Sequence, residues 1–144
     1  MSAGGGFLVV RAGTERYGVA LAAVEEVVDL PAPAPVPGGM EAFRGVTRWR
    51  DRHVSVVHLG ALLQGGAPPA APGESAVVVR VADRPVAFEV EAVEEVVEAG
   101  GTTTLDQREA VEVGDGVWRV GGVLVTMLDL EGLGERLAER RDGE

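Results

Sequence analysis

Acidic residues and histidines are the side chains whose types and spacing could do chemistry in this sequence. Two glutamate pairs, Glu25-Glu26 and Glu94-Glu95, offer the carboxyl groups that a glycoside hydrolase uses as acid and base. That reaction needs two carboxyl groups that converge across a cleft, whereas these carboxylates are adjacent and fall on solvated strands or turns. The pairs therefore predict surface residues rather than a catalytic dyad.

The two histidines do not form a metal site either. His53 and His58 are five residues apart in a predicted strand, so their side chains face opposite sides and cannot share a metal ion. The sequence has no cysteine, which removes disulfides, thiolate nucleophiles and Cys-based zinc sites. It also has no Ser/His/Asp elbow, no phosphate-binding glycine loop with lysine and no acidic metal loop. We therefore expect no catalytic residue, metal or cofactor, and a binding role is favoured over an enzyme.

The elements that position these residues come from an internal duplication. Residues 7–30 laid over 76–99 share nine identities in 24 positions, including the run Ala23–Val28, which returns as Ala92–Val97. At a slightly larger offset, Gly45 to Arg48 lies over Gly116 to Arg119. The duplication predicts two similar units of roughly 60 residues each.

Alternating side chains in each copy predict short strands joined by tight turns. Val86, Phe88 and Val90 alternate after the turn at 83–85, as a strand with one buried face requires, and Gly121-Gly122 favours a two-residue hairpin. Four or five short strands per copy predict an all-β fold with a short C-terminal helix, built as two SH3-like five-stranded β-barrel subdomains related by internal duplication.

The repeat also predicts boundaries within a single domain of residues 1–144. The first barrel covers about 7–64 and the second about 76–130. A Pro/Gly/Ala-rich linker of about 65–73 joins them, and the C-terminal helix covers about 131–141. A separate third domain is not expected at this length.

Charge is distributed unevenly along the chain. The net charge is −10, and residues 73–144 carry seven arginines against 17 acidic residues, whereas residues 1–72 carry six of each. Such a field repels nucleic acid and anionic membranes and favours partners with a basic surface. No basic segment followed by an apolar run marks export, and no apolar run could span a bilayer, so we expect a soluble cytoplasmic protein without membrane insertion.

Two features could bind a partner. One is the hairpin tip Arg48 to Arg52, where tryptophan and arginines of the kind found at interface hot spots are concentrated. Its alternative interpretation is a solvated hairpin end with Trp49 packed onto the barrel, and the residues leave both open. The other feature is the groove that two adjacent barrels leave between them, which suits a partner helix.

Several strings resemble a known family. FLVVRAGTERYGVALAAVEEVV at the start, then Val36-Pro37, Phe43 to Val46 and Val56 to Leu59, are similar to the CheW-like adaptor proteins of bacterial chemosensory systems. The resemblance runs from Phe7 to about Leu137 and includes the family's doubled SH3-like barrel.

The resemblance implies a function. Such adaptors join the regulatory domain of a CheA-type histidine kinase to the cytoplasmic tip of a chemoreceptor, have no catalytic activity, and are expected as monomers outside signalling arrays. The positions that align with, or lie beside, the family's partner-binding surfaces are Val24, Glu26, Gly45, Arg48, Trp49, Arg50 and Val93.

One region departs from the family pattern. The family usually has Asn-Leu-Arg-Gly at the hairpin, where this chain has Arg48 to Asp51, and it has Asp where this chain has His58. The change suggests an alternative, a divergent CheW-like scaffold that has lost or changed one partner and serves a pathway other than motility. A more remote alternative is a small-molecule-binding or hydrolytic protein that uses the cleft between the barrels.

Overall fold

The computed structural model describes residues 5–29, 33–35, 40–70, 75–104 and 106–142, and the string Val36-Pro37 lies outside these ranges. The first half contains β1 (Phe7–Ala12), β2 (Glu15–Ala20), the short 3-10 helix η1 (Leu21–Ala23), β3 (Val24–Val28), β4 (Phe43–Trp49), β5 (Arg52–His58) and helix α1 (Leu59–Gln64). The second half contains β6 (Ser75–Val81), β7 (Arg84–Val90), β8 (Ala92–Val97), β9 (Ala110–Gly114), β10 (Val117–Val120), β11 (Val123–Met127) and helix α2 (Leu130–Asp142).

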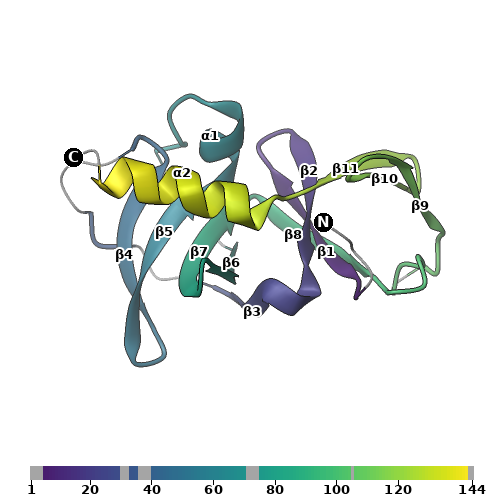
Figure 1. Cartoon of the computed structure of the whole chain (residues 1–144), viewed down its shortest axis with the longest axis horizontal. Coiled ribbons are helices and arrows are strands. Elements are labelled where there is room, and N and C mark those ends of the chain that lie inside the picture. Colours follow the sequence, from purple (N-terminus) through teal and green to yellow (C-terminus); the bar gives the residue numbers. More distant parts are fainter. Residues whose placement is uncertain (1–4, 30–32, 36–39, 71–74, 105, 143–144) are drawn as a thin grey trace.

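The strands form two sheets, each the centre of one subdomain (Figure 1). Sheet A has the order β8-β1-β2-β11-β10-β9, and sheet B has the order β3-β6-β7-β5-β4. The predicted all-β fold with two β subdomains and a C-terminal helix is confirmed. The sequence predicts five strands per subdomain, whereas sheet A has six.

The repeated Val-Glu-Glu-Val-Val stretches are the strands that cross between the subdomains. β3 pairs with β6, so that Val24 lies opposite Val79, and β8 pairs with β1, so that Val93 lies opposite Val10. Each sheet therefore combines the first hairpin of one repeat with the second half of the other repeat.

The predicted ranges 7–64 and 76–130 consequently do not separate the two sheets. Both ranges contribute strands to both sheets, because the chain leaves its first hairpin at η1 and again after β7. Val10 and Val79 are equivalent positions of the two repeats, so each crossing strand meets the same residue type that its own repeat offers.

Three apolar clusters show why the first strand of each repeat is almost continuously apolar. A central cluster joins the sheets and contains Leu8 and Val10 of β1 with Val77 and Val79 of β6. The alternate residue Val9 faces a second cluster within sheet A, and the alternate Val78 faces a third within sheet B. Both strands are therefore buried on both faces, and such strands lose the polar alternation of a half-exposed strand.

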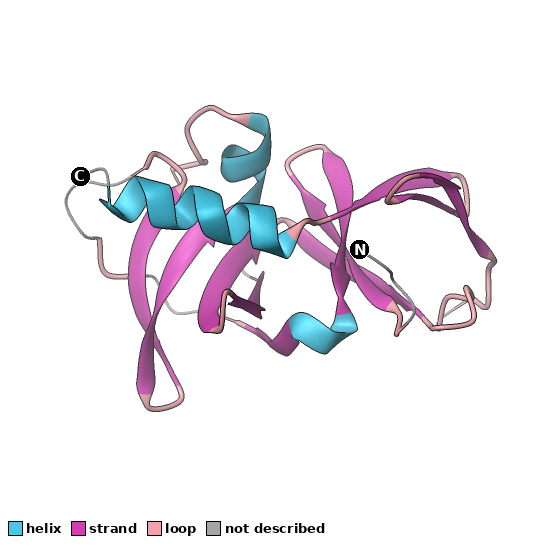
Figure 2. Cartoon of the chain, viewed as in Figure 1, coloured by secondary structure: helices cyan, strands magenta, loops and turns pink. Residues whose placement is uncertain are grey.

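The helices follow the last strand of each half. α2 lies across the strands of sheet B (Figures 1 and 2), and Leu133 packs into the central cluster. The helix predicted for about 131–141 is thus present as Leu130–Asp142. The sequence prediction missed α1, which has only six residues and is shorter than the window in which helical periodicity shows.

Candidate partner-binding surfaces

Glu26, Trp49 and Arg50 form one cluster that links β3 to the β4–β5 hairpin. The Trp49 indole Nε1 donates a hydrogen bond to Glu26 Oε1 at 3.0 Å, and the Arg50 guanidinium pairs with the same oxygen at 3.3 Å. The guanidinium carbon of Arg50 also lies 4.5 Å from the centre of the Trp49 ring, a cation–π contact. The arrangement fixes an exposed Glu–Arg pair above a buried tryptophan.

Burial decides between the two interpretations of Trp49. The residue is only 8% exposed and belongs, with Val54 and Val56, to the apolar cluster within sheet B. Trp49 therefore supports the hairpin from beneath, while Arg48 and Arg50 remain exposed. Residues around it can contact a partner, but the indole ring itself presents little surface.

The departure from the family's hairpin pattern is tolerated by the turn. Trp49 pairs with Arg52, so Arg50 and Asp51 form a two-residue turn. Only Arg50 has a positive φ, of 57°, and Asp51 is not among the residues with positive φ. The backbone thus does not require glycine at position 51. Asp51 changes the charge of the tip rather than its conformation.

Gly45 has a structural role in β4. Its φ is 141°, and a Cβ atom at this position would lie 2.1 Å from the carbonyl oxygen of Ala34. The close approach lets Ala34 and Val46 exchange two backbone hydrogen bonds of 3.0 Å. Gly45 is buried, so it shapes the edge of sheet B and offers no side chain to a partner.

Val24 and Val93 occupy equivalent positions in the two crossing strands. Both are half-buried and pack against the central cluster between the sheets. The two valines lie in different sheets. Val24 is on β3 of sheet B, the same strand as Glu26, whereas Val93 is on β8 of sheet A. The predicted site residues therefore divide into two sets. Val24 and Val93 lie at the junction of the subdomains, and the remaining five form the hairpin group: Glu26, Gly45, Arg48, Trp49 and Arg50.

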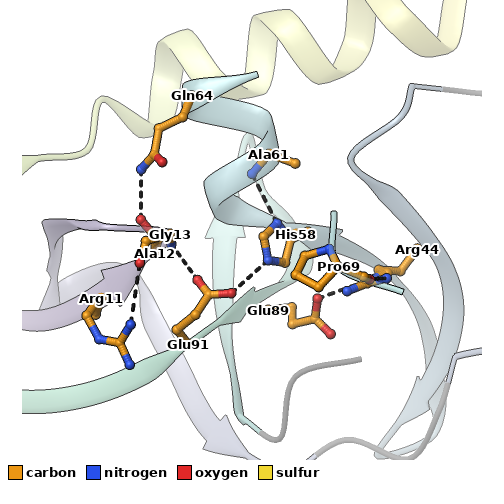
Figure 3. A network of polar contacts seen from close by, with 10 residues as sticks. All are labelled: Arg11, Ala12, Gly13, Arg44, His58, Ala61, Gln64, Pro69, Glu89 and Glu91. Carbon is orange, nitrogen blue, oxygen red and sulfur yellow. Dashed lines mark hydrogen bonds and ion pairs between the residues drawn. The ribbon is translucent and has the colours of Figure 1, made fainter. Parts of the chain in front are cut away.

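A second polar network at this junction was not identified from the sequence (Figure 3). His58, at the end of β5, contacts the Glu91 carboxylate with Nε2 at 2.9 Å. His58 Nδ1 accepts a hydrogen bond of 3.0 Å from the Ala61 amide and so caps α1. Because Nδ1 is an acceptor, the proton of the neutral ring belongs on Nε2, which donates it to Glu91. Glu91 also accepts a hydrogen bond from the Gly13 amide in the β1–β2 turn.

Glu91 thus ties both subdomains to α1. Burial by itself raises the pKa of the Glu91 carboxyl, but the hydrogen bonds from the Gly13 amide and from His58 Nε2 outweigh it and lower the pKa below its ordinary value. Gln64 adds a parallel link, because its Nε2 donates to the Ala12 carbonyl at 2.8 Å. The carboxylate is therefore held ionised at neutral pH.

His58 and Asp129 occupy equivalent places in the two halves. Asp129 Oδ1 accepts a hydrogen bond of 3.1 Å from the Gly132 amide at the start of α2, as His58 Nδ1 does from Ala61. The histidine that departs from the family pattern therefore keeps the capping function of an aspartate. His58 also contacts Glu91, which an aspartate cap does not require. The two residues are 33 positions apart in the chain, so their spacing in the sequence does not predict this contact.

Nearby, Arg44 joins the edge of sheet B to its centre. Arg44 Nε contacts Glu89 Oε1 at 2.9 Å, and the Glu89 side chain is only 4% exposed. Arg44 also donates to the Pro69 carbonyl, in the connection between the halves (Figure 3). Arg44, the residue before Gly45, thus connects β4 to β7 and to the connection between the halves.

The acidic side chains of the described residues are engaged mainly with arginines and backbone amides. Among them, no three His, Cys, Asp or Glu side chains come together to hold a metal ion. Within the described residues, no helix has the length and apolar character to cross a membrane. The adjacent glutamates of each repeated stretch pair with arginines, as in Arg80–Glu25 and Arg16–Glu94.

Comparison with known proteins places the chain in a family. The sequence matches the CheW-like domain over residues 6–138. This chain belongs to the CheW-like family. The CheW-like chain is similar in structure to the scaffolding protein TtCheW from Thermoanaerobacter tengcongensis, with a TM-score of 0.66 and 19% identity over 85% of this chain and 87% of that chain. A search of curated proteins finds no match.

The family membership confirms what the sequence strings predicted. CheW-like proteins are scaffolds and adaptors of chemotaxis signal transduction, and the predicted adaptor class is confirmed at that level.

Proposed function

We propose that this CheW-like chain is a non-catalytic adaptor that couples a CheA-type histidine kinase to chemoreceptors through protein–protein contacts. The observation that carries the proposal is the match to the CheW-like domain over residues 6–138. The proposed partners are the regulatory domain of the kinase and the cytoplasmic tip of a receptor.

The exposed part of the hairpin group is the proposed first contact surface. Glu26 and Arg50 are paired in the free protein, with side chains 45% and 60% exposed. An exposed pair of this kind contributes about 0–1 kcal/mol to folding, so it can re-pair with a partner's charges at little cost. Trp49 and Gly45 support this surface, and Val24 and Val93 lie at the junction between the subdomains, the proposed second surface.

The test is binding to a kinase regulatory domain from the same organism. Purified chain and regulatory domain are expected to co-elute in size-exclusion chromatography and to give a saturable heat of binding in titration calorimetry. Glu26→Arg, which places two like charges side by side, is expected to weaken binding about 10-fold or more to one of the two proposed partners. No binding to any such domain would contradict the coupling function.

A divergent adaptor with a changed partner is the second candidate, and the hairpin composition favours it. Arg48 and Asp51 are exposed and add charge where the family usually has Asn and Gly. The triple variant Arg48→Asn, Trp49→Leu, Asp51→Gly restores the family pattern. If the hairpin selects the partner, the variant changes receptor binding while its circular dichroism stays the same; unaltered binding would show that another surface discriminates.

A further inference from the structure

A groove on sheet B is lined by basic groups in an otherwise acidic protein. It has a volume of about 790 Å³. It lies where β5 and β7 begin, and the turn before β7 and one side of α2 complete it. Arg52, His53 and Arg84 line it, while Val86 and Leu137 supply apolar surface. None of Glu26, Trp49 and Arg50 lines this groove, although Arg52 pairs with Trp49 in the same hairpin.

The strand geometry explains why basic and apolar groups share the groove. β5 and β7 run parallel, with Ser55 opposite Val86. Side chains alternate along a strand, so His53 lies on the same face as Ser55, and Arg84 lies on the same face as Val86. That face carries Phe88 and the central cluster further along. The groove therefore continues the covered face of the sheet along the side of α2, at Gly134 and Leu137.

The two arginines of the groove have no partner among the residues that the structure describes. Five other arginines pair with glutamates, namely Arg16, Arg44, Arg50, Arg80 and Arg108. Within the described part of the chain, the side chains of Arg52 and Arg84 make no hydrogen bond or ion pair, and both residues are exposed. No aspartate or glutamate among the described residues lines the groove.

The basic lining of the groove contrasts with the net charge of −10 of the whole chain. With 23 acidic residues against 13 arginines, an exposed arginine has many more potential carboxylate partners than it needs. Two arginines without a partner among the described residues line this one hollow, Arg84 from the face that carries Val86 and Arg52 from the first position of β5. They make a local positive potential in a negative field, which attracts a complementary anionic surface. The apolar floor of Val86 and Leu137 adds a preference for an apolar side chain.

We propose that this groove docks an acidic amphipathic segment of a partner protein. Carboxylates of the segment pair with Arg52 and Arg84, a geometry that the arginine fork favours. An apolar side chain of the segment rests on Val86 and Leu137, in the manner of a helix bound in a groove. The inference goes beyond the coupling function, since it concerns a surface that the hairpin group does not include.

The test uses the full-length chain and two labelled peptides, without kinase or receptor. The first is a fluorescein-labelled peptide of about 14 residues with Glu and Leu at helical spacing, and the second has Gln at each Glu. Fluorescence anisotropy is expected to show about 10-fold tighter binding of the Glu peptide, with the difference shrinking between about 50 and 200 mM salt.

Matched charge variants locate the site. Arg84→Glu is expected to weaken binding of the Glu peptide about 10-fold, and Arg52→Glu similarly. Arg119→Glu is the control, because Arg119 is an exposed arginine of β10 in sheet A and its substitution changes the net charge by the same amount. It is expected to change affinity by about 2-fold or less. The neutral variant Arg84→Gln repeats the test without a new carboxylate, and circular dichroism verifies the fold of each variant.

Several results would overturn the inference. Equal affinity for the Glu and Gln peptides, an equal loss in the Arg119 variant, or no binding of the Glu peptide would each do so. Self-association in sedimentation experiments that Arg84→Glu abolishes would identify the occupant as a second copy of this chain instead. Because the assay contains no kinase or receptor, each of these outcomes leaves the proposed coupling function to its own test.

Discussion

At the scale of single residues, Glu91 has the widest influence on the junction of the subdomains. One carboxylate oxygen faces the Gly13 amide and the other faces His58 Nε2. His58 in turn caps α1 through the opposite ring nitrogen. A single ionised side chain thus holds a turn of sheet A, the end of β5 and the start of a helix in one network.

Glu91→Gln is predicted to destabilise the protein by about 1–2 kcal/mol at neutral pH. Glutamine has one acceptor oxygen, so it can satisfy the Gly13 amide or His58 Nε2 but not both. Urea unfolding of the variant and the wild type at pH 7 measures the difference. Glu112→Gln is the control, because among the described residues Glu112 accepts only a local hydrogen bond, from the Gly116 amide in an exposed turn.

The difference between wild type and Glu91→Gln depends on pH in a defined direction. Hydrogen bonds from Gly13 and His58 lower the pKa of Glu91 in the folded state against the opposing effect of burial. Its contribution is therefore complete above the ordinary glutamate pKa and is lost as the pH falls through the lowered, folded-state pKa. The stability difference should shrink below about pH 4.5. A difference that stays constant down to the lowest pH at which both proteins fold would contradict this assignment.

At the scale of elements, the edge of sheet B depends on the close approach of Ala34 to Gly45. The equivalent position beside β10 holds a full strand, β9, whereas beside β4 the described residues show an isolated bridge between Ala34 and Val46. Pro33 and Pro35 flank Ala34 and have no amide hydrogen to donate, so a continuous ladder cannot form there.

Gly45→Ala is predicted to destabilise the protein by about 2–3 kcal/mol. The new Cβ would collide with the Ala34 carbonyl oxygen, and the φ of 141° is unfavourable for any L residue with a side chain. Gly114→Ala serves as the control, because the nearest atom to its added Cβ is 3.9 Å away and its φ is not positive. The control should change stability by about 0.5 kcal/mol or less. Equal urea midpoints for the two variants would exclude the steric role of Gly45.

Local elements could be predicted from the sequence because their signals are local. The alternation Val86, Phe88, Val90 identified β7, and Gly121-Gly122 identified the β10–β11 turn. The burial of Trp49 stayed open because it depends on Glu26, a residue on another strand that offers the indole a hydrogen-bond acceptor. The groove at Arg52 and Arg84 stayed hidden for the same reason, since parallel pairing of β5 with β7 brings distant residues together.

At the scale of the whole molecule, the exchange of strands between the repeats could not be predicted. Val24 pairs with Val79, whose equivalent in the first repeat is Val10. The two candidate partners are identical residues in similar strings, so the sequence favours neither pairing. The duplication indicates that two subdomains form. The exchange takes place where the chain leaves each first hairpin, at η1 and between β7 and β8.

The exchange predicts how the chain responds to being divided. A cut after Ala67, in the exposed connection between the halves, leaves each fragment with strands of both sheets but with neither sheet complete. A full-length chain cleaved at an engineered protease site there should keep a single cooperative thermal transition and elute as one species, because the fragments share the central cluster. Fragments 1–67 and 68–144 expressed separately should each lack a cooperative transition and regain it on mixing in equal amounts. Two sequential subdomains would behave in the opposite way, each fragment unfolding cooperatively alone, and that result would show that the strands do not exchange.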